Sequence, residues 1–208
     1  VLIDLSPTSN GFYSLGTPVT FAGDFEVELD FSTTSSSSMT LVGGTSASTG
    51  TLRISVDPSG VMKVRFNNST LQGSIVVNDG KLHKLKARQV GGTETLYVDG
   101  VADGSSTTTQ TTNSITKIGV RDDGIQNFDG IISDVKLTDL TTPANSLAFK
   151  LDQLTANTET VDGVTLTYQN IGTGTDVRDT YELVDDDYVG SELVVNGDFA
   201  TSGDWLEL

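Results

Sequence analysis

The sequence predicts an all-β protein, built as a two-sheet antiparallel sandwich. Several short segments alternate apolar and polar residues, the period-two pattern of strands with one buried and one solvated face. The 208-residue chain has 22 glycines and many Ser and Thr residues, which suits numerous strands joined by turns. One sandwich can fill this length, so we expect one main core.

The clearest strand runs from Phe25 to Phe31, where apolar residues alternate with Glu26, Glu28 and Asp30. Because alternate side chains point to opposite faces, its three carboxylates should share the solvated face. The polar tract 32–38 that follows is expected to be a loop.

Two hairpins follow along the chain. The first joins residues 52–56 to residues 62–66 through the turn Asp57-Pro58-Ser59-Gly60. The second joins residues 82–90 to residues 96–98 through Gly91-Gly92 and closes at Asp99-Gly100. Further strands are expected at residues 115–120 and 131–137, with weaker patterns at 147–151, 164–168 and 181–184.

Charge and composition restrict the possible partners. The formal net charge is −16, from 12 basic and 28 acidic residues, and such a surface repels nucleic-acid phosphates. No apolar run is long enough to cross a bilayer, so membrane insertion is not expected. The chain has no cysteine, which leaves core packing or hard cations such as Ca²⁺ to hold the fold.

Two motifs resemble the laminin-G family. One is the hairpin Asp79-Gly80-Lys81-Leu82-His83-Lys84-Leu85 with Leu96-Tyr97-Val98-Asp99-Gly100, and the other is Ile118-Gly119 with Phe128-Asp129-Gly130-Ile131-Ile132-Ser133-Asp134-Val135-Lys136-Leu137. Leu82 replaces the aromatic residue that usually precedes the histidine. The resemblance implies a concanavalin-A-like, laminin-G-like jelly roll that binds ligands on a concave face or at calcium-holding rim loops.

The end of the chain changes character. We expect a laminin-G-like sandwich over residues 1–184 and an acidic linker over residues 185–191. Residues 192–208 resemble the first strand of a carbohydrate-binding jelly roll, so they are either the start of a truncated second module or a terminal docking strand. The arrangement of an acidic linker followed by such a first strand resembles that of modular phage virion proteins and marine bacterial surface proteins.

No catalytic site is predicted. Glu28-Leu29-Asp30 is similar to the E-x-D-x-x-E pattern of jelly-roll glycoside hydrolases, but Thr33 stands where the third carboxylate is needed. His83 alternates with Leu85 and Ala87, which favours a packed structural histidine over a catalytic one.

Two binding sites are candidates. Asp122, Asp123 and Asp129 gather oxygen ligands around one loop, which suits a calcium ion, although a solvated acidic loop is the alternative. Tyr97 projects away from Leu96 and Val98, so its ring is the candidate for stacking on a sugar, although an isolated surface tyrosine is the alternative.

The predicted function is therefore a non-catalytic glycan- or receptor-binding module of an extracellular or phage virion protein. The expected partners are a polysaccharide or cell-surface glycan, together with other virion or surface-protein subunits or further copies of the chain. The alternatives are a structural assembly module of a capsid or tail and, third, a polysaccharide-active enzyme.

Overall fold

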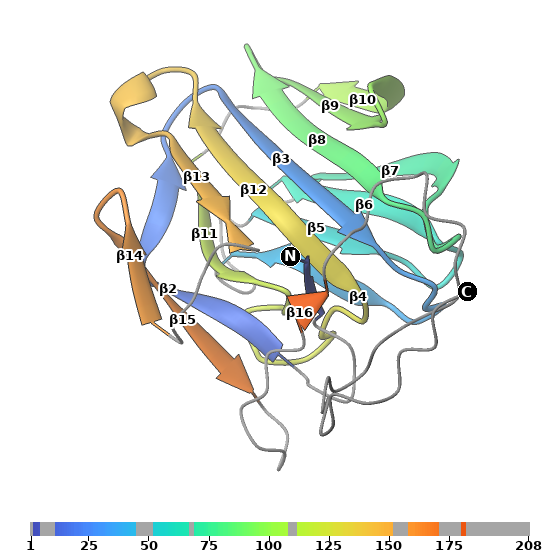
Figure 1. The fold of residues 1–208 in the computed structure, drawn as a ribbon. Coiled ribbons are helices and arrows are strands. Elements are labelled where there is room, and N and C mark those ends of the chain that lie inside the picture. The colour runs from blue at the N-terminus through green and yellow to red at the C-terminus, as the bar shows by residue number, and fades with distance from the viewer. Residues whose placement is uncertain are drawn as a thin grey trace, which may run out of the picture.

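The computed structural model describes residues 2–4, 11–44, 52–66, 69–107, 112–151, 158–170 and 180–181. These residues form two antiparallel sheets, as predicted from the alternating segments. Figure 1 shows the sheets packed face to face, with β3, β8 and β12 in front of β4, β5 and β6. The predicted linker 185–191 and the predicted segment 192–208 lie outside the described residues.

Sheet A carries the candidate site. Its strands in pairing order are β10 (Val101–Thr107), β9 (Thr93–Val98), β8 (His83–Val90), β3 (Phe25–Ser32), β12 (Ile131–Asp139), β1 (Leu2–Asp4) and β16 (Thr180–Tyr181), and β13 (Leu147–Lys150) also pairs with β12. A 3₁₀ turn, η1 (Pro143–Asn145), precedes β13.

Sheet B covers the inner face of sheet A. Its strands in pairing order are β14 (Thr158–Val161), β15 (Val164–Asn170), β2 (Gly11–Phe21), β11 (Asn113–Ile118), β4 (Met39–Gly43), β5 (Leu52–Val56), β6 (Val61–Phe66) and β7 (Ser69–Val76). None of the described residues forms a helix long and apolar enough to cross a membrane.

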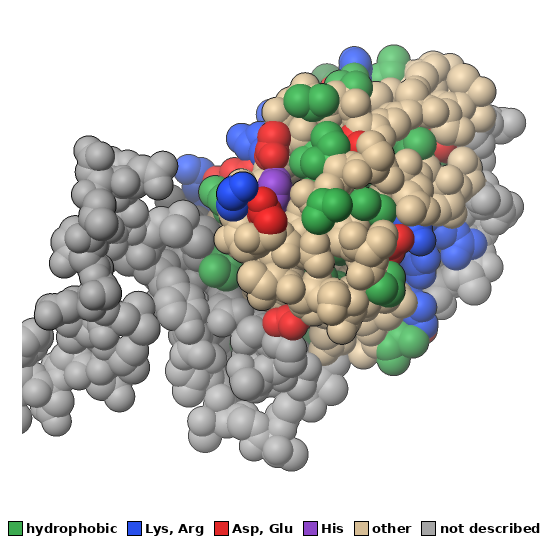
Figure 2. Space-filling view, turned by 90° about the vertical axis from the view of Figure 1, so that its right-hand side faces the viewer, with side chains coloured by type: hydrophobic (Ala, Val, Ile, Leu, Met, Phe, Trp, Pro, Cys, Tyr) green, Lys and Arg blue, Asp and Glu red, His purple; other side chains and the backbone are tan. Residues whose placement is uncertain are grey.

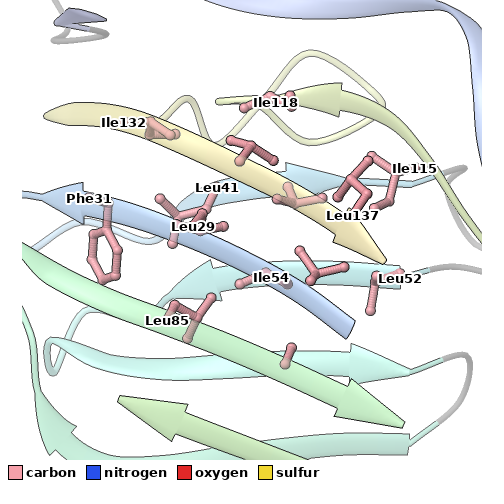
Figure 3. Close-up of a cluster of buried hydrophobic side chains, with 14 of the residues drawn as sticks. Leu29, Phe31, Leu41, Leu52, Ile54, Leu85, Ile115, Ile118, Ile132 and Leu137 are labelled. Carbon is pink, nitrogen blue, oxygen red and sulfur yellow. The ribbon is translucent and has the colours of Figure 1, made fainter. Parts of the chain in front are cut away.

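The core lies between the two sheets. Leu29 and Phe31 of β3 point inward beside Leu85 of β8, and they meet Leu41 and Ile54 of sheet B (Figure 3). These side chains are at most 1% exposed. Burial of this apolar surface supplies the main driving force for folding, and it orients every second residue of each strand toward solvent.

The tight turns use residues that tolerate positive φ. Asp99 and Gly100 have φ values of 52° and 79°, and Gly91 and Gly92 have values of 55° and 77°. Positive φ at both central residues is the requirement of a type I′ hairpin turn, which keeps the flanking strands in register. The predicted second hairpin is confirmed by these turns and by the pairing of β8 with β9.

Candidate functional site

The outer face of sheet A is a layer of paired charges. Strand pairing places the acidic residues of β3 directly opposite basic residues of β8: Glu26 opposite Arg88, Glu28 opposite Lys86, and Asp30 opposite Lys84. Residues opposite each other in an antiparallel pair share a face, so their side chains can meet. The shortest nitrogen–oxygen distances in these pairs are 2.9, 3.6 and 3.7 Å in that order.

This charged layer surrounds a hollow of about 380 Å³. Its walls come from β3, β8 and β9 and from the turn after β9, and they consist of Glu26, Glu28, Lys84, Lys86, Arg88, Tyr97 and Gly100. A smaller hollow of about 120 Å³ shares Glu28 and Lys84 with it and extends toward Asp134 and Lys136 of β12. The two hollows are therefore neighbours on one face.

Tyr97 is the aromatic residue of the larger hollow. It lies opposite Lys86 in the pairing of β8 with β9, and its side chain is half-buried. Its neighbours Leu96 and Val98 are 0% and 1% exposed, so the predicted outward projection of Tyr97 is confirmed. An aromatic ring beside charged hydrogen-bonding groups can stack on the C–H face of a sugar while those groups contact its hydroxyls.

The carboxylates of β3 lack the third member of the hydrolase pattern. Thr33, which holds that position, is 3% exposed, and its hydroxyl donates a hydrogen bond to the Asp129 carbonyl at 2.6 Å. Burial raises the pKa of Asp30 above its ordinary value, and the positive charge of Lys84 opposes this rise. The site therefore presents ion-paired carboxylates beside a tyrosine.

His83 links the turn that precedes β8 to the turn that follows β9. Its Nδ1 lies 2.8 Å from Asp99 Oδ2, and its Nε2 lies 3.0 Å from Asp79 Oδ1. Burial alone would lower the pKa of His83, but hydrogen bonds and negative charge from Asp99 and Asp79 raise it above the ordinary value. His83 is therefore packed and hydrogen-bonded as predicted, with acidic side chains on both sides (Figure 2).

The predicted calcium ligands lie on the loop after β11, where the side chains of Asp122 and Asp123 have other partners. Asp123 binds Arg121 through both carboxylate oxygens, with Arg121 Nε 2.8 Å from Oδ1. Asp122 Oδ1 accepts from the Thr116 hydroxyl at 3.4 Å, and Asp129 accepts the Thr33 bond through its backbone. Among the described residues no three acidic or histidine side chains gather in a metal-binding arrangement, so calcium binding stays a prediction.

Sequence reasoning identified the acidic face of β3 but did not combine it with the basic face of β8 into one site. The available signal was the opposite sign of two alternating segments, acidic at Glu26, Glu28 and Asp30 and basic at Lys84, Lys86 and Arg88. The two strands are far apart in sequence. Only the register of β3 against β8 shows that these side chains surround Tyr97.

Comparison with known proteins identifies the family. Residues 14–148 match the family model described as the concanavalin A-like lectin/glucanases superfamily, a span that includes both laminin-G-like motifs. No curated protein sequence matches the chain significantly.

Solved structures with the same fold are distant in sequence. A Bacteroides ovatus protein, described as a putative carbohydrate binding protein, aligns over 80% of this chain and 57% of its own. The identity is 15% and the TM-score is 0.61. Domains LG4-5 of the mouse laminin α1 chain align over 61% of this chain and 40% of theirs (21% identity, TM-score 0.50). A heptameric pentraxin from Limulus polyphemus aligns over 66% and 75% (15% identity, TM-score 0.53). The chain thus spans little more than half of the Bacteroides ovatus protein.

Proposed function

The chain belongs to the concanavalin A-like lectin/glucanases superfamily, and on that premise we propose that its sandwich is a non-catalytic module that binds a glycan on the outer face of sheet A. The observation that carries the proposal is the half-buried ring of Tyr97 in a hollow of about 380 Å³ lined by five charged side chains. The proposed location is outside a cell or on a virion.

The chemistry of the hollow suits a sugar. A pyranose ring offers an apolar C–H face for Tyr97, and its hydroxyls can both donate to Glu26 and Glu28 and accept from Lys86 and Arg88. The ion pairs across β3 and β8 hold these groups in place before a ligand arrives, which lowers the entropy cost of binding. Both signs of charge line the hollow, so a neutral or weakly charged sugar fits best.

The same ion pairs support a binding role over hydrolysis. A glycosidase of the usual kind needs one carboxyl group as acid and a second as nucleophile or base. Glu26 and Glu28 instead lie within 4 Å of lysine or arginine nitrogens, and Thr33 occupies the third position of the motif. The description of the Bacteroides ovatus protein as carbohydrate-binding adds support from a related fold.

A glycan array with the intact chain tests the proposal, together with an assay for reducing sugars on each glycan that binds. The expected result is selective binding of a small set of glycans with no release of sugar. Binding to none of them, by this chain and by any longer protein that contains it, would favour an assembly module. Released reducing sugar would show an enzyme and contradict the proposal.

A further inference from the structure

Two arginines lie directly opposite each other on the outer face of sheet B. Arg53 of β5 pairs with Arg65 of β6, and the residues beside them, Leu52 and Phe66, are buried in the core. Both guanidinium groups therefore project from the same face of the sheet. Like charges directly opposite in a sheet repel each other, so the two guanidinium groups together favour a bound counter-charge.

A third arginine, Arg121, is brought close to this pair by the loop after β11. The loop packs onto the outer face where Gly43 of β4 lies opposite Arg53. A Cβ atom on Gly43 would lie 2.4 Å from the Val120 carbonyl oxygen and 3.4 Å from Arg121 Cα, so only glycine leaves room for the loop. The charge of Arg121 acts on Arg53 together with that of Arg65.

Within the described part of the chain, Arg53 is the member of this group that forms no ion pair. Its Nε atom is buried and makes no hydrogen bond, and no carboxylate among the described residues forms an ion pair with its side chain. By contrast, Arg121 binds Asp123, and Lys117 donates to the Asp122 carbonyl at 2.5 Å. Burial, and then the charges of Arg65 and Arg121, lower the pKa of Arg53, and the negative charge of Asp123 opposes this shift.

We propose that Arg53, Arg65 and Arg121 form an anion-binding site on the outer face of sheet B that takes the carboxylate or sulfate groups of an acidic polysaccharide. Figure 2 shows Lys and Arg side chains gathered on the right-hand side of the view, on the sheet B side of the sandwich. The site lies on the sheet opposite the Tyr97 hollow and does not depend on it.

Guanidinium chemistry sets the ligand class. A planar guanidinium presents donors in a fork that matches a carboxylate or sulfate. The side chains of Arg53, Arg65 and Arg121 are each partly exposed. The net charge of −16 opposes any polyanion at long range, but screening at physiological salt limits that effect to about 8 Å. An acidic polysaccharide carries widely spaced charges, so one or two of them can bind at the cluster. A nucleic-acid duplex carries about one charge per 1.7 Å, so the acidic surface around the cluster would repel it.

The test measures binding of the intact chain to polygalacturonate, dextran sulfate and neutral dextran by isothermal titration calorimetry. Arg53→Gln is compared with Lys150→Gln, which removes the same charge from an exposed position on sheet A. We expect at least tenfold weaker binding of an acidic polymer by Arg53→Gln, a change of less than twofold for Lys150→Gln, and no effect of Arg53→Gln on any binding of dextran. Whichever acidic polymer binds identifies carboxylate or sulfate as the preferred group.

Equal weakening in the two variants, unchanged binding by Arg53→Gln, or binding to neither acidic polymer would overturn the proposal. Melting curves check folding, and Arg53→Gln should melt no lower than the wild type because the substitution removes like-charge repulsion. If it does melt lower, Arg65→Gln serves as the second variant with the same expectation. Tyr97→Ala should leave acidic-polymer binding intact, which separates this site from the proposed glycan site.

Discussion

Tyr97 lies directly opposite Lys86 in the antiparallel pairing of β9 with β8, and Lys86 lies directly opposite Glu28 of β3. One row across three strands therefore places an aromatic ring, an ammonium group and a carboxylate side by side on a solvated face. The row depends on strand register alone, since a shift of one residue would turn all of these side chains toward the core.

The His83 cluster makes stability depend on pH. The pKa of His83 is raised, so its stabilisation is complete below the ordinary value of 6.5 and is lost as pH rises through the folded value. The pKa values of Asp79 and Asp99 are depressed, so their stabilisation is present above the ordinary value of 3.8 and is lost as pH falls through the folded values. The full contribution therefore lies between about pH 4 and 6.5.

We accordingly expect His83→Gln to lower the free energy of unfolding by about 1–2 kcal/mol more at pH 5.5 than at pH 8.5, a range reduced for the solvent exposure of Asp99. Urea denaturation at the two pH values measures this difference. Lys81→Gln is the control, because its exposed ammonium group contacts the same Asp79 carboxylate without joining the His83–Asp99 contact. An equal loss at both pH values would show that the charge of His83 contributes nothing.

Asp103 joins the edges of the two sheets. Its Oδ1 on β10 accepts hydrogen bonds from the backbone nitrogens of Ser74 and Ile75 on β7 at 2.8 and 3.0 Å. A Cβ atom on Gly73 would lie 1.8 Å from Asp103 Oδ2. Because this contact would displace the carboxylate, Gly73→Ala should lower the free energy of unfolding by about 2–3 kcal/mol.

Gly16→Ala is the matched control for Gly73→Ala. Gly16 also lies in a strand of sheet B, but its added Cβ would meet Thr165 at an ordinary distance of 3.4 Å. It should be neutral or stabilising by up to about 1 kcal/mol, because glycine loses the most conformational freedom on folding. Equal effects of the two substitutions in urea denaturation would disprove the role given to Asp103.

The predicted calcium site at Asp122, Asp123 and Asp129 can be tested through Arg121, which now binds Asp123. Calcium must compete with this arginine, so Arg121→Gln should increase the rise in melting temperature produced by millimolar calcium. Binding to the folded state alone stabilises by about 2.7 kcal/mol at a hundredfold excess over Kd. Replacing Asp122 and Asp123 together with asparagine should remove the rise. A melting temperature that changes with neither calcium nor EDTA would contradict the calcium prediction and indicate a solvated acidic loop.

The local pattern of the sequence was sufficient to predict both hairpins and the strands β3, β11 and β12, but it missed β2, β4, β7, β10 and β14. Alternation placed Phe25 to Phe31, both hairpins and the inward direction of His83 correctly, because one solvated face imposes a period of two on each strand. The exposed direction of Tyr97 followed from the same rule.

Contacts between distant strands were beyond this reasoning. The pairing of β3 with β8 brings Glu28 to Lys86, and the loop over Gly43 brings Arg121 to Arg53. Neither relationship follows from local periodicity, because both depend on which strands become neighbours. The pairing of Arg53 with Arg65 could have been predicted, because the turn Asp57 to Gly60 determines the register of that hairpin.

The affinity of Tyr97 variants for a glycan selected on the array tests the central claim most directly. Titration calorimetry should show binding weakened roughly threefold to tenfold by Tyr97→Ala, the loss expected for one aromatic contact. Tyr97→Phe should stay within about twofold of the wild type, because it keeps the ring. If Tyr97→Ala folds normally and binds the glycan as tightly as the wild type, the hollow on sheet A is not the glycan site.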